Sequence, residues 1–322
     1  MRIELGFPAA GIVAELESLV RETLKNEGGI ETVDIEISTK ITAHGVQRNL
    51  KPLANVRNVV AVASGKGGVG KSTTAVNLAL ALAGEGANVG VLDADIYGPS
   101  IPLMLGIPGE QPSSDDGQSM NPLTAHGLQV MSIGFLIDPD QPMVWRGPMV
   151  TQALNQMLQQ TRWSDLDYLI VDMPPGTGDI QLTLSQQVPV SGAVIVTTPQ
   201  DIALLDARKG LQMFRKVNVP VLGIIENMST HVCTSCGHEE PLFGSGGGAQ
   251  MAAEYDVELL GQLPLDLRIR QQTDSGQPSV IAEPDAGPAD AYRKTARKMA
   301  ARLAAQGKDY SARFPKIVVE ET

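Results

Sequence analysis

One short stretch constrains this chain more than any other. It reads Ser-Gly-Lys-Gly-Gly-Val-Gly-Lys-Ser-Thr over residues 64–73, between an apolar run (59–63) and a helix-forming run (74–83). The pattern G-x-x-x-x-G-K-S between a strand and a helix is typical of a phosphate-binding loop, or P loop. Its glycines let backbone N–H groups point inward, and the new helix offers its positive N-terminal end to the same anion. The alternative is a flexible glycine turn that binds nothing.

The P loop predicts which residues hold a nucleotide and its metal. We expect Lys71 to reach the β- and γ-phosphates and the Ser72 hydroxyl to bind Mg²⁺. The remaining loop positions complete the predicted nucleotide contacts, namely Gly65, Lys66, Gly67, Gly68, Val69, Gly70 and Thr73. The expected ligand is therefore a nucleotide with magnesium.

Lys66 goes further than the generic motif. Because it follows the first glycine directly, the loop resembles the deviant Walker A loop of the MinD, ParA and nitrogenase iron protein class of P-loop ATPases. The resemblance implies that this extra lysine contacts phosphates across a nucleotide-sandwich homodimer, where other NTPases use an arginine finger. The alternative is a solvated lysine.

Composition and charge limit the class of protein. With 322 residues, 43% of them hydrophobic, the chain can bury one large α/β domain and hold a small extra one. The net charge of −11 disfavours a protein whose main task is to coat DNA or an anionic membrane. No apolar stretch is long enough to span a bilayer, and the start lacks a signal-peptide hydrophobic region. We expect a cytoplasmic protein with no nucleic-acid or membrane partner.

The chain divides into a small N-terminal segment and a large domain. Residues 1–50 read as an α+β segment with a short first strand, a helix (10–25) that ends at a glycine pair, and a second strand (33–37). Residues 51–56 read as a linker and 57–322 as the P-loop ATPase domain. So small a segment forms a marginal core, so we expect it to pack on the main domain or on a partner.

In the large domain, strands and helices alternate. This alternation predicts an α/β fold with a mostly parallel sheet and helices on both faces. The predicted strands are mostly short β-branched runs without charges, typical of strands buried on both faces. They span residues 59–63, 89–92, 128–133, 168–171, 193–197, 221–225 and 258–263. Ligands of such sheets bind where strands end, so the residues after each strand carry the functional signal.

Two carboxylates, Asp93 and Asp95, follow the strand that ends at Leu92. At the level of the P loop they can orient a Mg²⁺-bound or attacking water. In the resembled class this is switch I, which implies that Asp95 acts on the attacking water. The expected catalytic residues are thus Lys66, Lys71 and Asp95. We expect Asp93 to hold the P-loop lysine or the metal shell. The alternative is a pair of helix-capping aspartates.

Two further strand ends carry polar residues. Asp172 directly follows an apolar strand, which is the Walker B arrangement in which a carboxylate reaches Mg²⁺ through its water. Gly176 can offer its N–H to the γ-phosphate, so that this loop senses hydrolysis. Asn227 follows the strand over 221–225 and can read adenine through its amide, as an asparagine does in the resembled class. The alternatives are ordinary turns.

Both cysteines of the chain, Cys233 and Cys236, lie in one C-x-x-C. A secreted disulfide framework uses several spaced cysteines, so the pair favours metal or redox chemistry. Structural zinc and [4Fe–4S] clusters take four ligands, which leaves one chain two short. A homodimer that joins two such pairs reaches four cysteines and suits a shared, releasable cluster. The alternatives are zinc completed by His231 and His238, a redox dithiol and an inert pair.

Taken together, the motifs resemble one family. They are the P loop, D-A-D-I-Y-G-P-S (93–100), W-R-G-P-M (145–149), D-M-P-P-G-T-G-D (172–179), E-N-M-S (226–229) and the C-x-x-C. The combination resembles the Mrp/ApbC family of iron–sulfur cluster carrier ATPases over about residues 55–285. The resemblance implies a homodimer that slowly hydrolyses ATP, holds a [4Fe–4S] cluster on paired cysteines and transfers it to apo iron–sulfur proteins. Many bacterial members begin with a small domain of which residues 6–40 resemble only the later half.

Two other functions use the same nucleotide residues. A spatial-organising ATPase like MinD or ParA should carry a membrane-targeting helix or a basic DNA surface. The apolar face of the last predicted helix (289–305) is largely alanine, so a packing helix is favoured over a membrane-targeting one. The second alternative is a nucleotide-gated dimer clamped by zinc.

Overall fold

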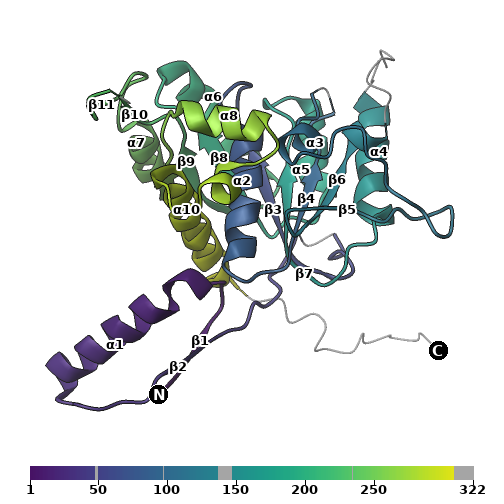
Figure 1. The fold of residues 1–322 in the computed structure, drawn as a ribbon. Helices are drawn as coiled ribbons and strands as arrows, with labels where there is room; N and C mark the ends of the chain where they lie inside the picture. Colours follow the sequence, from purple (N-terminus) through teal and green to yellow (C-terminus); the bar gives the residue numbers. More distant parts are fainter. Residues whose placement is uncertain (48–49, 97, 137–146, 234, 308–322) are drawn as a thin grey trace, which may run out of the picture.

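The computed structural model describes residues 1–47, 50–96, 98–136, 147–233 and 235–307. Its centre is an eight-stranded sheet in the order β12-β9-β8-β3-β7-β4-β6-β5 (Figure 1). Neighbouring strands are parallel except β5, which runs antiparallel to β6 at one edge. The strands are β3 (Val56–Ala63), β4 (Val89–Asp93), β5 (Leu123–Ala125), β6 (Leu128–Ser132), β7 (Leu166–Asp172), β8 (Gly192–Thr197), β9 (Val221–Glu226) and β12 (Glu258–Gln262).

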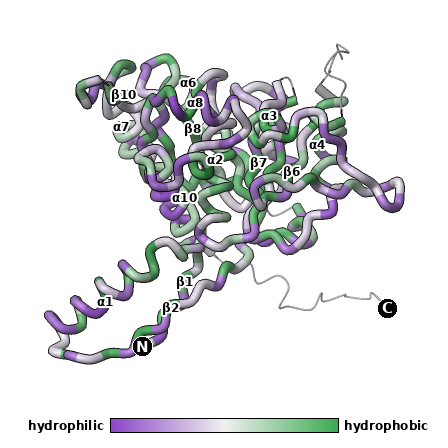
Figure 2. The backbone as a smooth tube through the Cα atoms, viewed as in Figure 1, coloured by the Kyte–Doolittle hydropathy of each residue, from purple (hydrophilic) through white to green (hydrophobic). Residues whose placement is uncertain are grey.

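The predicted α/β class is confirmed. All seven predicted strands are present within three residues of their expected ends, and the three-residue edge strand β5 is the one described strand of this sheet that was not predicted. The central strands are short apolar runs because both of their faces are covered, and β3, β7 and β8 are almost entirely buried. Figure 2 shows the same pattern as hydrophobic colour over the central strands.

Helices cover both faces of this sheet. The connection from β3 through α2 leads toward the β5 edge, and the connection from β8 through α6 leads toward the β12 edge. Because such crossovers are right-handed, α2 and α6 lie on opposite faces. The helices are α1 (Val13–Gly28), α2 (Lys71–Gly84), α3 (Ile101–Met104), α4 (Gly147–Gln160), α5 (Asp179–Gln187), α6 (Asp201–Lys216), α7 (Gly247–Glu254), α8 (Leu267–Asp274), α9 (Ser279–Ala282) and α10 (Gly287–Ala304), with 3-10 turns at Ala10–Ile12 and Ile133–Phe135.

The last helix, α10, lies beside α2 (Figure 1). Its apolar face is fully buried, including Tyr292, Met299 and Leu303. Each such side chain contributes roughly 1.5–3 kcal/mol by leaving water. The predicted packing role of this helix is therefore confirmed, and the membrane-targeting alternative is wrong for this face. In the described part of the chain, none of the helices combines the length and hydrophobicity needed to span a bilayer.

The N-terminal segment projects from the main domain (Figure 1). β1 (Arg2–Leu5) and β2 (Glu36–Thr39) form a parallel pair joined by α1, which ends at Gly28 with Gly29 in the left-handed conformation of a C-cap. Contact with the main domain is made at the base of the segment, where Ala9 is buried and Gly11 donates to Glu85 at 2.7 Å. The helix α1 has no buried residue. The expectation of packing on the main domain thus holds at the base and fails along α1.

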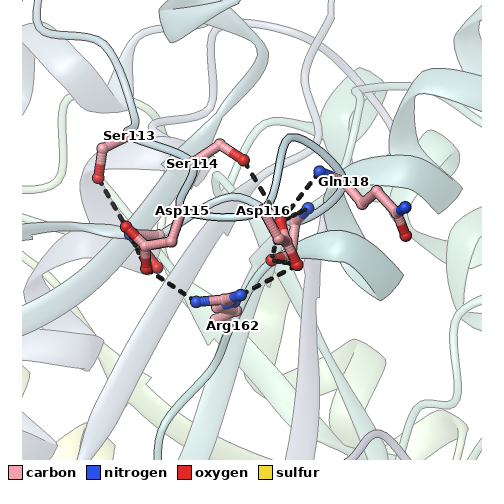
Figure 3. A network of polar contacts seen from close by, with 8 residues as sticks. Ser113, Ser114, Asp115, Asp116, Gln118 and Arg162 are labelled. Atoms are coloured by element: carbon pink, nitrogen blue, oxygen red, sulfur yellow. Dashed lines mark hydrogen bonds and ion pairs between the residues drawn. The ribbon is translucent and has the colours of Figure 1, made fainter.

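A polar network organises the loop before β5 (Figure 3). Arg162, which follows α4, donates to Asp115 at 2.8 Å and to Asp116 at 3.0 Å. Asp116 also accepts hydrogen bonds from the backbone N–H groups of Ser119 and Gln118, at 2.8 and 2.9 Å. These donors, led by Ser119, hold the pKa of the Asp116 carboxyl well below its usual range. The network closes the loop onto the end of α4.

Candidate nucleotide and metal site

The P loop leaves β3 where the strand order reverses, which is the expected ligand position in such a sheet. It bounds a cavity of about 200 Å³ that Asp95, Ser100, Met104 and Pro175 close from the facing loops. The predicted loop residues on its wall are Lys66, Gly67, Gly68, Gly70, Lys71, Ser72 and Thr73. Gly65 and Val69 are not among its lining residues, and Val69 is buried.

Gly70 caps the start of α2 and shows why the loop needs glycine. Its φ of 78° lies in the left-handed region, and a Cβ added there would stand 2.2 Å from the Nδ2 atom of Asn227. A larger residue would strain the backbone and collide with that amide. The path of the loop into α2 therefore requires a residue without a side chain at this position.

Lys71 is buried beside two acids. Its Nζ lies 2.6 Å from Asp172 Oδ1 and 3.6 Å from Asp95 Oδ2, and it donates to the Ser72 hydroxyl at 3.3 Å. The Lys71 side chain is 6% exposed and that of Asp172 is fully buried. A buried ion pair needs such close geometry to offset the loss of hydration of both charges. The structure thus brings together the predicted residues of the P loop, switch I and Walker B strand.

Asp93 does not contact the P-loop lysine, and its place in the metal shell stays a prediction. Its Oδ1 accepts from the backbone N–H of Asp95 at 3.2 Å, and its Oδ2 accepts from Ile101 N–H at 3.2 Å and from the Ser132 hydroxyl at 3.0 Å. Lys71 pairs with Asp172 and Asp95 instead. The prediction that Asp93 holds the P-loop lysine is therefore wrong in this structure. Asp93 thus holds the switch I loop through hydrogen bonds to its backbone.

The electrostatics of this strand-end cluster favour a cation. Asp93 and Asp172 are direct neighbours on β4 and β7. Burial raises the pKa of Asp93 to about 7, and the charge of Asp172 adds to the rise. Burial also raises the pKa of Asp172, against the opposing effect of Lys71. Two adjacent buried carboxyls are costly to ionise together, and positive charge placed beside them lowers that cost.

The residues present fit the predicted Mg²⁺. Asp172 Oδ2 is buried and has no hydrogen-bond partner within the residues that the structure describes. The Ser72 hydroxyl adjoins the same Lys71–Asp172 pair. Magnesium prefers carboxylate and hydroxyl oxygens and retains several waters, so a water-mediated contact to Asp172 Oδ2 suits it. Ser72 and Asp172 remain the predicted magnesium residues.

Gly176 and Asn227 both contact the P-loop region rather than open space. The Gly176 N–H, predicted to bind the γ-phosphate, donates to the Ser64 carbonyl at 3.0 Å. The Asn227 amide, predicted to read adenine, donates to the Val69 carbonyl at 2.9 Å, and its Oδ1 accepts from Met228 N–H. Both residues therefore lie beside the P loop, and neither is among the lining residues of the cavity. Their contacts to phosphate and base stay predictions.

The two cysteines lie on a short hairpin formed by β10 (His231–Val232) and β11 (Glu239–Glu240) (Figure 1). Hydrogen bonds of 2.9 Å, from Cys233 N–H to His238 O and from Gly237 N–H to Cys233 O, close the turn. Cys236 is exposed and Cys233 half-buried. The N–H groups of Ser235 and Cys236 lower the pKa of the Cys233 thiol, which favours the metal-binding thiolate.

The structure argues against a zinc site completed within one chain. Among the described residues there is no group of three or more His, Cys, Asp or Glu side chains placed to hold a metal ion. His231 directs Nδ1 to the carbonyl of Leu265 at 3.0 Å. The Cys₂His₂ alternative is therefore not assembled among the described residues. The hairpin offers two thiols, two fewer than the four ligands that zinc or a [4Fe–4S] cluster takes.

Lys66 is exposed on the wall of the cavity, and its backbone carbonyl accepts a hydrogen bond from the Ser64 hydroxyl at 2.9 Å. An exposed lysine beside a phosphate site suits a contact with a second chain, which stays a prediction. Tyr97 of the switch I motif and residues 145–146 of the W-R-G-P-M run lie outside the described residues.

The sequence analysis misses Ser132 and names Glu226 only as part of the E-N-M-S motif. Ser132 ends β6 and donates to Asp93, and Glu226 ends β9 with its carboxylate fully buried. The signal that could have found them is the same in both cases. Each is a polar residue that ends a mostly apolar strand at the ligand edge of the sheet.

Comparisons with known proteins agree with this geometry. A family model described as "ParA: NUBPL iron-transfer P-loop NTPase" matches residues 55–300. The iron-sulfur cluster carrier protein of Pseudomonas fragi is 59% identical over 279 residues, which cover 86% of this chain and 97% of that protein. The iron-sulfur cluster transfer protein NUBPL of Mus musculus is 52% identical over 267 residues, 82% of this chain and 83% of its own length.

Solved structures show the same fold. A nucleotide-binding protein from Archaeoglobus fulgidus in complex with ADP has a TM-score of 0.64 at 36% identity and covers 72% of this chain and 90% of its own. The cell division ATPase MinD of Pyrococcus furiosus has a TM-score of 0.55 at 22% identity, with 75% and 98% covered, and shares the fold alone. The structure contains the P loop, the Lys71–Asp172 pair and the cysteine hairpin, and the chain belongs to the iron-transfer P-loop NTPase family.

Proposed function

We propose that this chain is an ATP-hydrolysing carrier that holds a [4Fe–4S] cluster between two copies of itself and transfers it to apo iron–sulfur proteins. The observation that carries the proposal is the hairpin with Cys233 and Cys236, in a chain whose named relatives are iron–sulfur cluster carriers. Two accessible thiols, one with a lowered pKa, can bind a cluster and also release it. Four ligands require a second chain.

The nucleotide part of the proposal rests on the buried centre around Lys71. Lys71 binds the phosphates, Asp95 orients the attacking water, and Lys66 reaches the phosphates of the partner chain. Ser72 and Asp172 hold Mg²⁺, which neutralises phosphate charge when bound. Support comes from the 2.6 Å Lys71–Asp172 contact and from the ADP complex of the Archaeoglobus fulgidus protein.

The cytoplasmic location and the division of the chain by a linker at residues 51–56 also stay predictions.

Anaerobic reconstitution with iron and sulfide tests the cargo. The wild-type protein should gain the visible absorbance of a cluster and about four iron atoms per dimer, as a [4Fe–4S] cluster requires. Ser235→Ala, in the same hairpin, is the matched control and should load normally. Cys233→Ala and Cys236→Ala should lose the cluster, because they are the only cysteines of the chain.

The same samples separate the alternatives. Uptake of zinc without a cluster chromophore would support the zinc-clamped dimer and refute the carrier. A full cluster in the double cysteine variant would refute the assigned ligands. The spatial-organising alternative gains no support from α10, because its apolar face is buried against the main domain. Transfer to an apo iron–sulfur protein, followed by recovery of that protein's activity, completes the test.

A further inference from the structure

Glu226 is a buried acid for which the proposed function has no use. It ends β9, its side chain is fully buried, and its two oxygens accept hydrogen bonds from Gly248 N–H at 2.6 Å and from the Gln262 amide at 2.8 Å. A carboxylate without water is costly unless donors surround it. Gly248 is the second residue of α7, so the positive end of that helix adds to the stabilisation. The donors around Glu226 therefore offset the cost of burying its charge.

The geometry at Gly248 supports the same conclusion. A Cβ added there would lie 2.9 Å from Glu226 Cβ and 3.0 Å from its Oε2. The next position back, Gly247, would place a Cβ 2.4 Å from Leu204 Cδ1 of α6. The start of α7 is therefore wedged against Glu226 and α6, and it can approach only because both positions lack side chains.

Glu226 fixes one leg of the cysteine hairpin. The chain leaves β9 at Glu226, forms the hairpin, and returns through residues 244–248 to α7. The outgoing leg is fixed as well, because Ser229 donates to the Leu263 carbonyl and Leu265 N–H donates to the Thr230 carbonyl at 2.8 Å. Both legs of the hairpin are thus tied to the ends of β9 and β12.

The neighbouring residue is tied to the P loop. Asn227 donates its amide to the Val69 carbonyl at 2.9 Å, and its backbone N–H donates to Thr197 O at 2.7 Å. The consecutive residues Glu226 and Asn227 therefore contact two different parts of the protein. Asn227 holds the nucleotide loop, and Glu226 holds the return leg of the cysteine hairpin. A shift of the P loop therefore has a direct route, through residues 226 and 227, to the return leg of the hairpin.

We propose that Glu226 is a positioning residue that couples the nucleotide site to the cysteine hairpin, so that nucleotide bound at the P loop changes the reactivity of Cys233 and Cys236. The inference rests on the nucleotide half of the proposed function. Coupling is reciprocal for binding, so a cluster on the hairpin also changes nucleotide affinity. Glu226 touches neither ligand and acts through Gly248 and Asn227.

The test uses the metal-free, full-length protein and a thiol reagent. Because the chain has only two cysteines, the labelling rate reports the hairpin alone. We expect a non-hydrolysable ATP analogue to change the wild-type labelling rate by about fivefold or more, the usual range of coupling between sites. Glu226→Ala should reduce that ratio to near one while the analogue still binds with an affinity within about threefold of wild type, since the P-loop residues are unchanged.

Two variants separate coupling from stability. Glu226→Gln should keep most of the ratio, because it preserves shape and the Gln262 amide can turn to satisfy it. Glu85→Ala is the matched control, since Glu85 is also buried and accepts from Gly11 and Arg297. It lies at the far end of α2, roughly 20 Å from the P loop by helix length, and should leave the ratio unchanged.

A wild-type ratio of one, or an unchanged ratio in Glu226→Ala, overturns the inference. Loss of the ratio in Glu85→Ala overturns it too, because any buried acid would then have the same effect. If Glu226→Ala does not fold, Gly248→Ala displaces the same contact from the other side and should also lower the ratio. Failure to load a cluster sinks the carrier proposal alone, because thiol labelling needs no cluster.

Discussion

Replacing Lys71 by Met tests the buried ion pair at the centre of the site. Methionine keeps most of the length of the lysine side chain and removes its charge, so Asp172 remains buried without its 2.6 Å partner. Removal of one partner of a buried pair typically costs about 3–5 kcal/mol. Asp172 is fully buried and Lys71 is 6% exposed, so solvent offers little compensation. We expect the free energy of unfolding to fall by that amount at pH 8.

The penalty should depend on pH with a definite sign. Burial already raises the pKa of Asp172 and Lys71 opposes the rise, so the pKa climbs further in the variant. A carboxyl whose pKa is raised by folding is most favourable when protonated, and its contribution is lost as the pH rises through the folded-state pKa. The cost of Lys71→Met should therefore be smaller at pH 5 than at pH 8.

Urea unfolding of the nucleotide-free protein, followed by circular dichroism at both pH values, measures this cost. Arg162→Met is the matched control, because it breaks two exposed ion pairs, with Asp115 and Asp116, each worth less than about 1 kcal/mol. Asp172→Asn and the double variant complete a cycle that should give a coupling energy of about 1–3 kcal/mol between Lys71 and Asp172. A penalty at pH 8 no larger than that of Arg162→Met, or a larger penalty at pH 5, would refute the reasoning.

Three other residues give separate predictions. Lys66→Ala should bind ATP within a few-fold of wild type and lose turnover, measured as phosphate release; unchanged hydrolysis would exclude its phosphate role. Asn227→Ala should weaken ATP and GTP binding equally if the amide only holds the P loop through Val69, whereas a selective loss for ATP in competition assays would show that it reads adenine. Because the pKa of Asp93 is about 7, wild-type stability should fall on the order of 2 kcal/mol from pH 5 to pH 8, and a denaturation series on Asp93→Asn that keeps the full slope would exclude Asp93 as its source.

The sequence predicts strands and strand ends well for a physical reason. Strands buried on both faces must be apolar, so a charged or polar residue at their ends stands out. Asp93 and Asp172 are found in this way, and both lie at the ligand edge as expected. Spacing alone also places Lys71 at the start of α2, and the structure shows it beside Asp172 and Asp95.

The sequence does not show which acid at the ligand edge of the sheet pairs with Lys71. Asp93 and Asp95 are both candidates for Lys71, and the choice depends on the path of the switch I loop. Ile101 and Ser132, which take up the Asp93 carboxylate, come from two other elements. The projecting course of α1 is equally hidden, because its apolar positions fit a buried helix and an exposed one alike.

Two predicted nucleotide contacts have internal partners in this structure. The Gly176 N–H donates to the Ser64 carbonyl and the Asn227 amide donates to the Val69 carbonyl. The Asn227 amide is buried, and buried donors are almost always hydrogen-bonded. If a nucleotide takes the Gly176 N–H, as predicted, that N–H must give up its bond to Ser64. The affinity measured for ATP then includes the cost of the exchange.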